Sequence, residues 1–331
     1  MTEAEIKTVV DRHNKLRRQE GSDNMELLTW NSSLAGVAET WARGCVFEHP
    51  VKAEHPEYTD TGQNIFMRGG ERALRLPQDL MPWYNEKVDF DYETSTCAAD
   101  RQCGHYQVMV FATATKIGCA YHDCEPLTGN VQRPQAMYLV CNYWPLIKEH
   151  PDDKEFTKGV ACSSCKSGAG WCDDRLCNGE CTRRSQHCQC MVVCYNCATV
   201  NETTCRCQCA AGWHSHDCTV RCDDTSDMCD PQPGQAGYSS ADCSDPQSVV
   251  AEQCPAWCGF CQPDPDAVAD KCPPVKGSGY RSASSGDVTT TSLAGNASSA
   301  AAASVNTRPM LVISIAEMMT IIYSSSSSSQ S

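Results

Sequence analysis

The sequence predicts an α+β fold in which a three-layer α/β/α sandwich is followed by small disulfide-rich modules and a disordered tail. In residues 1–146, helical periodicity precedes and surrounds a group of strand-like apolar runs. Of the 26 cysteines, six precede residue 150 and nineteen lie between residues 162 and 261. Segments this rich in cysteine bury too little apolar surface alone and depend on disulfides. Residues 262–331 are rich in Pro, Ser, Ala and Thr, a composition typical of disorder.

The composition indicates an extracellular protein. A net charge of −14 argues against nucleic acid and anionic membrane surfaces as partners. The cysteine content is typical of an oxidising compartment. Asn31, Asn201 and Asn296 each begin an Asn-x-Ser/Thr triplet and are candidate glycosylation sites. The chain opens directly on a polar helix, so we expect a secreted precursor whose leader is missing from this sequence.

The first expected helix covers residues 3–18, where apolar residues recur at helical spacing. His13 and Arg17 lie one turn apart on one face of it. Their expected role is structural, as hydrogen-bonded residues that pack the helix. The other expected elements are, in order, a helix over 34–42 preceded by capping residues 31–33, a turn into a strand at 62–66, a helix over 80–88, and strands over 106–112, 116–121 and 137–144.

Two stretches concentrate polar residues beside cysteines and apolar runs. Residues 97–111 read CAADRQCGHYQVMVF, and residues 137–145 read MYLVCNYWP. We interpret the run 108–111 as a buried strand, with His105 held at its mouth facing a cleft. On its own, a histidine in this position is more often a satisfied core residue.

Four motifs make residues 1–146 resemble the CAP domain shared by cysteine-rich secretory proteins, insect venom antigens and plant pathogenesis-related proteins. HNKLR at residues 13–17 is similar to the family's HNxxR helix, and GQNI at 62–65 to its GEN turn. CGHYQVMVF resembles the GHYTQVVW strand, with Phe111 in the tryptophan position, and YLVCNYWP resembles the last strand.

The resemblance also implies three disulfides in this domain. Plant-like and glioma-related-like members pair a local loop, the cysteine after the second helix with a later one, and two adjacent strands. The corresponding pairs here are Cys97 with Cys103, Cys45 with Cys124, and Cys119 with Cys141. Venom-type members use another pair, whose positions hold Thr61 and Trp144 in this chain.

The family's central cleft implies a candidate site at His49, Gln63, Glu86 and His105, where Gln63 replaces the usual glutamate. His49, Glu86 and His105 form a candidate ligand set for a weakly bound divalent metal such as zinc. The alternative is a hydrogen-bonded structural cleft that requires no cofactor. Gln63 lowers the attraction for a cation but keeps a hydrogen-bonding carbonyl. His55 is an alternative to His49 for this position in the cleft, because both histidines lie in the same loop.

The sequence contains no motif that would make this cleft catalytic. Hydrolysis needs a nucleophile beside a base, or a metal-bound water. Neither a GxSxG elbow nor an HExxH helix occurs in the sequence, and Asp100 and Tyr106 have no defined spacing to a partner. We therefore expect no catalytic residues and no enzyme, although proteolysis has been proposed for some relatives.

Residues 147–181 read as a polar linker followed by a four-cysteine segment that resembles the hinge after many animal CAP domains. The implied pairs are Cys162 with Cys172 and Cys165 with Cys177. A CxxC is also a redox or zinc motif, but in such a disulfide-rich chain the structural interpretation is favoured.

Two further modules are expected. Residues 188–218 end like an EGF-like module, but contain more than the usual six cysteines, so their pairs stay open, as does the partner of Cys272. Residues 222–261 resemble a ShK-toxin-like (ShKT) domain. They lack the Lys-Tyr pair of channel-blocking members. The implied ShKT pairs are Cys222 with Cys261, Cys229 with Cys254, and Cys243 with Cys258.

The tail, residues 262–331, contains one apolar run at 310–323. The run is too short to span a bilayer as a helix. Small residues before it weakly suggest a lipid-anchor signal, from which the polar ending SSSSSSQS departs. Membrane contact is expected only if such an anchor exists.

Together these features predict a secreted protein with a non-catalytic ligand- or partner-binding role in defence, venom or extracellular signalling. The expected partner is an extracellular protein or, as the resemblance implies, a sterol or other lipid. One alternative is a metal-dependent hydrolase that uses the cleft. Another is a matrix or cell-surface protein that acts through its EGF-like and ShKT modules.

Overall fold

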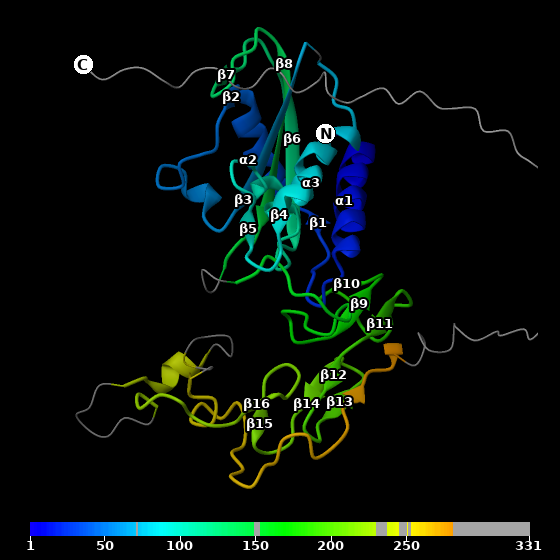
Figure 1. Cartoon of the computed structure of the whole chain (residues 1–331), viewed down its shortest axis with the longest axis vertical. Helices are drawn as coiled ribbons and strands as arrows, with labels where there is room; N and C mark the ends of the chain where they lie inside the picture. Colours follow the sequence, from blue (N-terminus) through cyan, green and yellow to red (C-terminus); the bar gives the residue numbers. More distant parts are fainter. Residues whose placement is uncertain (71, 149–152, 230–236, 245–249, 251–252, 281–331) are drawn as a thin grey trace, which may run out of the picture. The chain divides into compact units, whose positions relative to one another are not determined.

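The centre of the N-terminal domain is a four-stranded sheet in the order β1-β6-β8-β3 (Figure 1). The computed structural model describes residues 1–331 except 71, 149–152, 230–236, 245–249, 251–252 and 281–331. Strands β3 and β6 pair antiparallel with β8, and β1 pairs parallel with β6. The strand bounds are β1 Thr29–Trp30, β3 Gly62–Gly69, β6 Lys116–Cys124 and β8 Ala136–Trp144.

Helices cover both faces of this sheet, which confirms the predicted three-layer sandwich. Helix α2 (Ser32–Arg43) contacts β6 and β8 on one face, while α1 (Glu3–Arg17) and α3 (Met81–Asn85) lie on the other (Figure 1). Successive residues of β8 face opposite layers, as the strand period of two requires. Leu139, Cys141 and Tyr143 belong to the larger core, and Tyr138 and Val140 to the core beneath α2.

Glycine at position 118 allows α2 to lie directly on the sheet. A Cβ atom at Gly118 of β6 would meet the backbone of Asn31, Leu34 and Ala35. Any larger residue would push the start of α2 away from β6. The remaining elements of this domain are η1 Arg18–Glu20, β2 Val46–Phe47, η2 Pro56–Tyr58, η3 Gln78–Leu80, η4 Glu86–Asp89, β4 Phe90–Asp91, β5 Thr96–Cys97, α4 Gly104–Met109 and β7 Thr128–Gly129.

The strand expected over residues 106–112 is wrong, because this segment begins with the short helix α4. Tyr106 and Met109 are buried three positions apart, a spacing that suits one face of a helix. A short apolar run fits a buried strand and a buried helix equally well. The deciding contact comes from Glu86, whose carboxylate accepts the N–H groups of His105 and Tyr106 at the start of α4. Such acceptors stabilise a helix N-terminus.

Arg17 ties α1 to two distant parts of the chain. Its guanidinium is buried and donates six hydrogen bonds of 2.8–3.2 Å, all to backbone carbonyl oxygens. The acceptors are the carbonyls of residues 26, 109, 111, 112 and 114. One turn earlier, buried His13 bonds the Val9 carbonyl and the Tyr143 hydroxyl, each at 2.8 Å. Burial lowers the pKa of His13 to about 4. Both residues thus have the expected packing role.

Every one of the 26 cysteines is in a disulfide. All eight pairs expected from the resemblance are present in the structure. The pairs that the sequence left open are Cys181–Cys188, Cys190–Cys205, Cys194–Cys207, Cys197–Cys272 and Cys209–Cys218.

The four-cysteine segment after the linker is joined to the N-terminal domain by backbone hydrogen bonds. The Leu27 N–H donates to the Cys177 carbonyl and the Cys177 N–H to the Met25 carbonyl, both at 2.8 Å. Leu176 is fully buried in the larger core of the sandwich. Strands β9 (Trp171–Asp173), β10 (Leu176–Cys177) and β11 (Cys188–Cys190) form a small sheet in the order β10-β9-β11.

The chain after residue 262 differs from the expected tail, because part of it folds back. Cys272 is bonded to Cys197, and β17 (Val275–Lys276) pairs with β12 (Val193–Cys194). Arg221 donates to two carbonyls of this returning segment, those of residues 264 and 267. The other elements here are β13 Thr199–Asn201, β14 Arg206–Gln208, β15 Trp213–His214, β16 Val220–Arg221 and η5 Ser240–Ser244.

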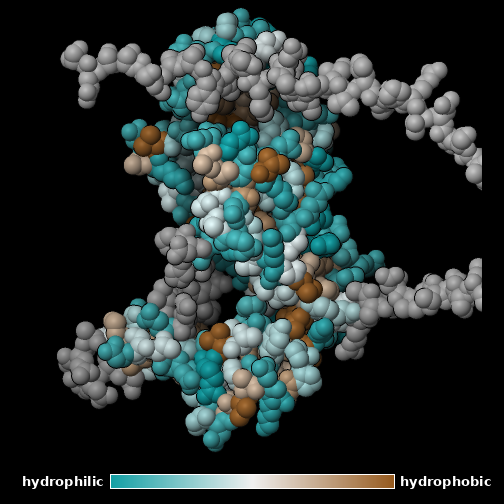
Figure 2. Space-filling view, viewed as in Figure 1, coloured by the Kyte–Doolittle hydropathy of each residue, from teal (hydrophilic) through white to brown (hydrophobic). Residues whose placement is uncertain are grey.

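Asn296 and the apolar run at 310–323 lie outside the described residues. Within the described residues, no helix has the length and apolar character that crossing a bilayer requires. The face shown in Figure 2 is mainly hydrophilic, with hydrophobic residues scattered over it. Scattered apolar residues of this kind are normal on a protein surface.

The buried carboxyl group of Glu26 should make stability depend on pH. Glu26 is only 6% exposed, and burial raises its pKa from 4.5 to about 7. The folded state therefore binds this proton more tightly than the unfolded state, so its contribution to stability falls as the pH rises from about 4.5 to about 7. Glu26→Gln should therefore increase the free energy of unfolding by about 2 kcal/mol more at pH 8 than at pH 5.

Urea unfolding at the two pH values measures this difference. The exposed Glu54→Gln variant is the matched control and should change stability equally at both. Equal effects of Glu26→Gln at pH 5 and pH 8 would contradict the prediction.

Candidate functional site

The four candidate cleft residues come from four different elements and meet in the structure. His49 follows β2, Gln63 is on β3, Glu86 begins η4, and His105 is on α4. Three of them, His49, Gln63 and His105, line a cavity of about 510 Å³. Glu86 lies behind His105 and supports it through hydrogen bonds.

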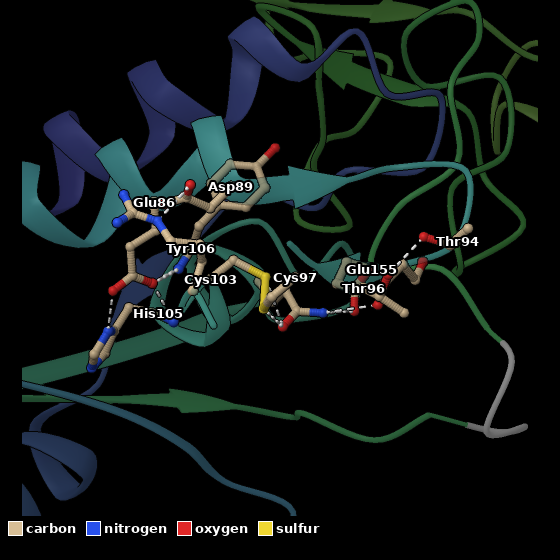
Figure 3. Close-up of a disulfide and its surroundings, with 12 residues drawn as sticks. Glu86, Asp89, Thr94, Thr96, Cys97, Cys103, His105, Tyr106 and Glu155 are labelled. Carbon is tan, nitrogen blue, oxygen red and sulfur yellow. Dashed lines mark hydrogen bonds and ion pairs between the residues drawn. A yellow bond between two sulfur atoms is a disulfide. The ribbon is translucent and has the colours of Figure 1, made fainter. Parts of the chain in front are cut away.

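Glu86 fixes the position and the orientation of His105 (Figure 3). One carboxylate oxygen lies 2.6 Å from the His105 Nδ1, and the other accepts the backbone N–H of His105 at 2.9 Å. Both oxygens are thus engaged. Trp83 stacks on the imidazole, with ring centroids 6.3 Å apart at 22°. With its Nδ1–H donated to Glu86, His105 keeps Nε2 for other contacts.

A chain of amide hydrogen bonds sets the tautomer of His49. Asn142 donates to the Leu34 carbonyl at 3.3 Å, and Gln63 donates to the Asn142 Oδ1 at 3.3 Å. The Gln63 Oε1 therefore faces the His49 Nδ1, 3.0 Å away. Because a carbonyl oxygen only accepts, Nδ1 must carry the proton in neutral His49. Desolvation, and to a smaller extent the nearby His105, lower the pKa of His49, while the bond to Gln63 opposes this shift.

His55, the alternative to His49, lies elsewhere. Its Nδ1 is 3.2 Å from Glu57, and its ring packs edge-on against Trp41 and Tyr58. The structure therefore places His49, and not His55, beside Gln63 in the cavity wall.

The predicted metal set of His49, Glu86 and His105 does not assemble as three ligands. Among the described residues, three ligand atoms come within 4.8 Å of one another only in two cysteine-containing groups, whose cysteines are in disulfides. The rings of His49 and His105 face each other at 6.4 Å between centroids, while Glu86 orients His105. Two imidazoles fall short of the three protein ligands that catalytic zinc usually has.

The cavity wall carries positive charge that the sequence interpretation missed. Lys52 and Arg101 line it, and none of its described residues is an aspartate or a glutamate. Arg101 also bonds Asp89 at 3.0 Å, on the edge of the site. Two sequence signals could have found these residues, because Lys52 shares the loop of His49 and Arg101 lies inside the Cys97–Cys103 loop.

The hydroxyl groups in the wall are not activated as nucleophiles. Thr61 donates to the Thr59 carbonyl at 3.2 Å, and Tyr58 donates to the Val37 carbonyl at 3.4 Å. Burial raises the pKa of Tyr58 to about 12, so its hydroxyl stays protonated. Among the described residues of the wall, no hydroxyl lies in hydrogen-bond contact with a base. The arrangement offers a ligand the cations of Lys52 and Arg101 and the Nε2 atoms of two imidazoles.

Replacing Gln63 should change the pKa of His49 in a direction set by the new side chain. Gln63→Glu places a negative charge beside Nδ1 and should raise the pKa of His49 by about 1. Gln63→Met removes the hydrogen bond that favours the charged imidazole and should lower it. NMR titration of the imidazole protons measures both effects, with His55 as the internal control. A His49 pKa that moves the same way in both variants would contradict this account.

Comparison with known proteins identifies the family of the N-terminal domain. Residues 10–143 match the model of the family described as "CAP: Cysteine-rich secretory protein family". Human peptidase inhibitor 15 is 37% identical over 187 residues, which cover 51% of this chain and 68% of that protein. Mouse peptidase inhibitor 16 is 33% identical over 181 residues, covering 54% of this chain and 34% of that protein.

Solved structures of similar proteins are more distant. The structure of BmVAL-1 is 21% identical with a TM-score of 0.44, and covers 55% of this chain and 97% of that one. The crystal structure of NaASP2 with Zn2+ is 21% identical with a TM-score of 0.42, and covers 54% of this chain and 96% of that one. The family model and the identity to peptidase inhibitor 15 are decisive: this chain belongs to the cysteine-rich secretory protein (CAP) family.

Proposed function

We propose that this chain is a secreted, non-catalytic binding protein whose CAP cleft takes an acidic group of an extracellular protein partner. The observation that carries the proposal is the character of the cavity wall. Lys52, Arg101 and two imidazoles line it, with no described carboxylate, in a chain whose net charge is −14. An anion that enters the cavity therefore meets the cations of Lys52 and Arg101 in the wall, while the carboxylates of Asp89 and Glu86 lie behind Arg101 and His105.

The side-chain cations in the cleft wall, Lys52 and Arg101, suit a carboxylate ligand. His105 and His49 each donate Nδ1–H to a protein acceptor, so Nε2 of each neutral imidazole is an acceptor and can donate to a carboxylate only once the ring is protonated. Protonation of either imidazole would add a charged donor. The Lys52 ammonium forms no ion pair or hydrogen bond with the described residues, so it is free to meet an incoming anion. Hydrogen bonds between ionised partners are the strong ones.

The alternative function, a metal-dependent hydrolase, is less well supported. One oxygen of Glu86 accepts the first N–H groups of α4 and the other contacts the His105 Nδ1, so a role as a base or as a third metal ligand would compete with one of these contacts. Metal-assisted hydrolysis needs a bound water and an open coordination position on a firmly held ion.

The relatives favour a protein as the partner. The similar proteins from human and mouse are named peptidase inhibitors. A peptidase would be a protein partner of the kind that we propose. We infer that a peptidase is the first class of partner to test. A sterol or another lipid, which the family resemblance also implied, is the competing ligand class.

The cysteine-rich segments are proposed as stabilised spacers or additional binding modules of this secreted protein. The chain has thirteen disulfides and no free cysteine, which supports synthesis in an oxidising compartment. We interpret residues 147–181 as a linker and hinge, 188–218 as EGF-like and 222–261 as ShKT-like. If these modules carried recognition instead of the cleft, the protein would act as a matrix or cell-surface interaction protein.

Calorimetry with short peptides tests the cleft. A polyglutamate peptide should bind the full chain, with an affinity that falls as salt is added, whereas polyglutamine and polylysine peptides should not. Lys52→Glu should weaken polyglutamate binding at least tenfold, because it reverses the charge in the wall. Lys15→Glu, an exposed lysine on α1, makes the same change in net charge and should have little effect.

Equal binding of the glutamate and glutamine peptides would refute a charge-selective cleft. Equal weakening by Lys52→Glu and Lys15→Glu would do the same, since it would reflect net charge alone. Saturable heat from a sterol, with none from any peptide, would assign the cleft to lipid.

A further inference from the structure

The last residue of β8 presents a tryptophan to solvent on the α2 side of the sheet. Trp144 is 45% exposed and is the only exposed residue of β8. The two residues before it define the faces, because Asn142 bonds the Leu34 carbonyl of α2 and Tyr143 bonds His13 of α1. Strand side chains alternate, so the indole of Trp144 lies on the same side as α2.

A cavity of about 360 Å³ extends between Trp144 and the start of α2. Asn31, Ser33 and Leu34 line it from the helix, and Glu57 and Thr59 from the loop opposite. Cavities of this size hold small organic groups in proteins. Its wall combines an exposed aromatic surface with hydroxyl and carboxylate groups and contains no described lysine or arginine. Such a wall suits a neutral ligand rich in hydroxyl groups.

Asn31 is one of the residues that line this cavity. It is the N-cap of α2, and its Oδ1 accepts the Leu34 N–H at 2.9 Å. Its backbone N–H donates to the Ile117 carbonyl at 2.8 Å. These bonds hold the residue but leave Nδ2 without a hydrogen-bond partner among the described residues. Asn31-Ser32-Ser33 is also an acceptor triplet for N-glycosylation.

We propose that Asn31 carries an N-linked oligosaccharide whose first sugars lie in this cavity against the indole of Trp144. The attachment point is part of the cavity wall, so the occupant is tethered and its ordering cost is lowered. The apolar face of a sugar ring covers the exposed indole, while Glu57 accepts hydrogen bonds from sugar hydroxyls.

The attachment reaction is a group transfer without oxidation or reduction. Nδ2 of Asn31 bonds to the anomeric carbon of an oligosaccharide carried on a lipid pyrophosphate. The bond between that carbon and the pyrophosphate oxygen breaks, the lipid pyrophosphate leaves, and Nδ2 loses one proton. The inference rests on the proposed passage through the secretory route, but not on ligand binding in the cleft.

Asn201 provides an internal comparison. Its Oδ1 accepts the N–H groups of Thr203 and Thr204 at 3.0 and 3.2 Å, at the end of the β13–β14 hairpin. Both threonines are exposed. A glycan on this turn would extend into solvent. Its rate of enzymatic release is therefore the reference for an oligosaccharide that does not contact the protein.

Occupancy is tested on the full chain secreted from a eukaryotic host behind a host signal peptide. Peptide mass spectrometry after deglycosylation in heavy-oxygen water should find Asn31 modified. Ser33→Ala should abolish the modification while leaving the Asn31 cap in place, and Ser33→Thr should retain it. An unmodified Asn31 in the secreted wild-type protein would overturn the proposal.

Docking is tested by enzymatic release of the glycans from the native protein with peptide N-glycosidase F. Release from Asn31 should be at least tenfold slower than from Asn201 in the wild type, and the two rates should become equal after denaturation. Trp144→Ala should speed release from Asn31 alone, and Trp144→Phe should restore part of the protection. A release rate at Asn31 that is unchanged by Trp144→Ala would refute docking on the indole. The glycan does not depend on the cleft. If no peptide bound to the cleft, the release rates at Asn31 and Asn201 would still test docking of the glycan.

Discussion

The six hydrogen bonds of the buried Arg17 guanidinium bring together segments that are about ninety residues apart in the sequence. They connect α1 to the carbonyl of residue 26, just before β1, and to the carbonyls between α4 and β6. A buried carbonyl without a donor is costly, and Arg17 supplies donors to five carbonyls here. Arg17 therefore determines where α4 ends and where the chain turns into the sheet.

The site depends on this constraint because α4 is held at both ends. Arg17 bonds the carbonyl of Met109 at its C-terminus, and Glu86 accepts the first N–H groups at its N-terminus. A helix of only six residues has little stability of its own, so these tertiary contacts maintain it. The carboxylate that anchors the helix also orients the His105 imidazole. The fold and the site therefore share one side chain, because one oxygen of Glu86 holds α4 and the other holds the imidazole.

The sequence predicted the features that repeat along the chain or leave a composition signal. Helical and strand periods indicated the sandwich, and motif resemblance indicated His49, Gln63, Glu86 and His105 and eight disulfides. It failed at α4, because four apolar residues carry no period that separates a helix from a strand. It also missed the return of Cys272 to Cys197, since spacing alone does not reveal disulfide connectivity. The role of Glu86 depends on atomic contacts that no pattern contains.

The end of β8 links the cleft to the neighbouring cavity. Asn142 orients Gln63 and through it His49, whereas Trp144, two residues later on the same face, borders the cavity at Asn31. Thr61, the residue before β3, lines both cavities. An oligosaccharide on Asn31 would therefore stand at the rim of the cleft.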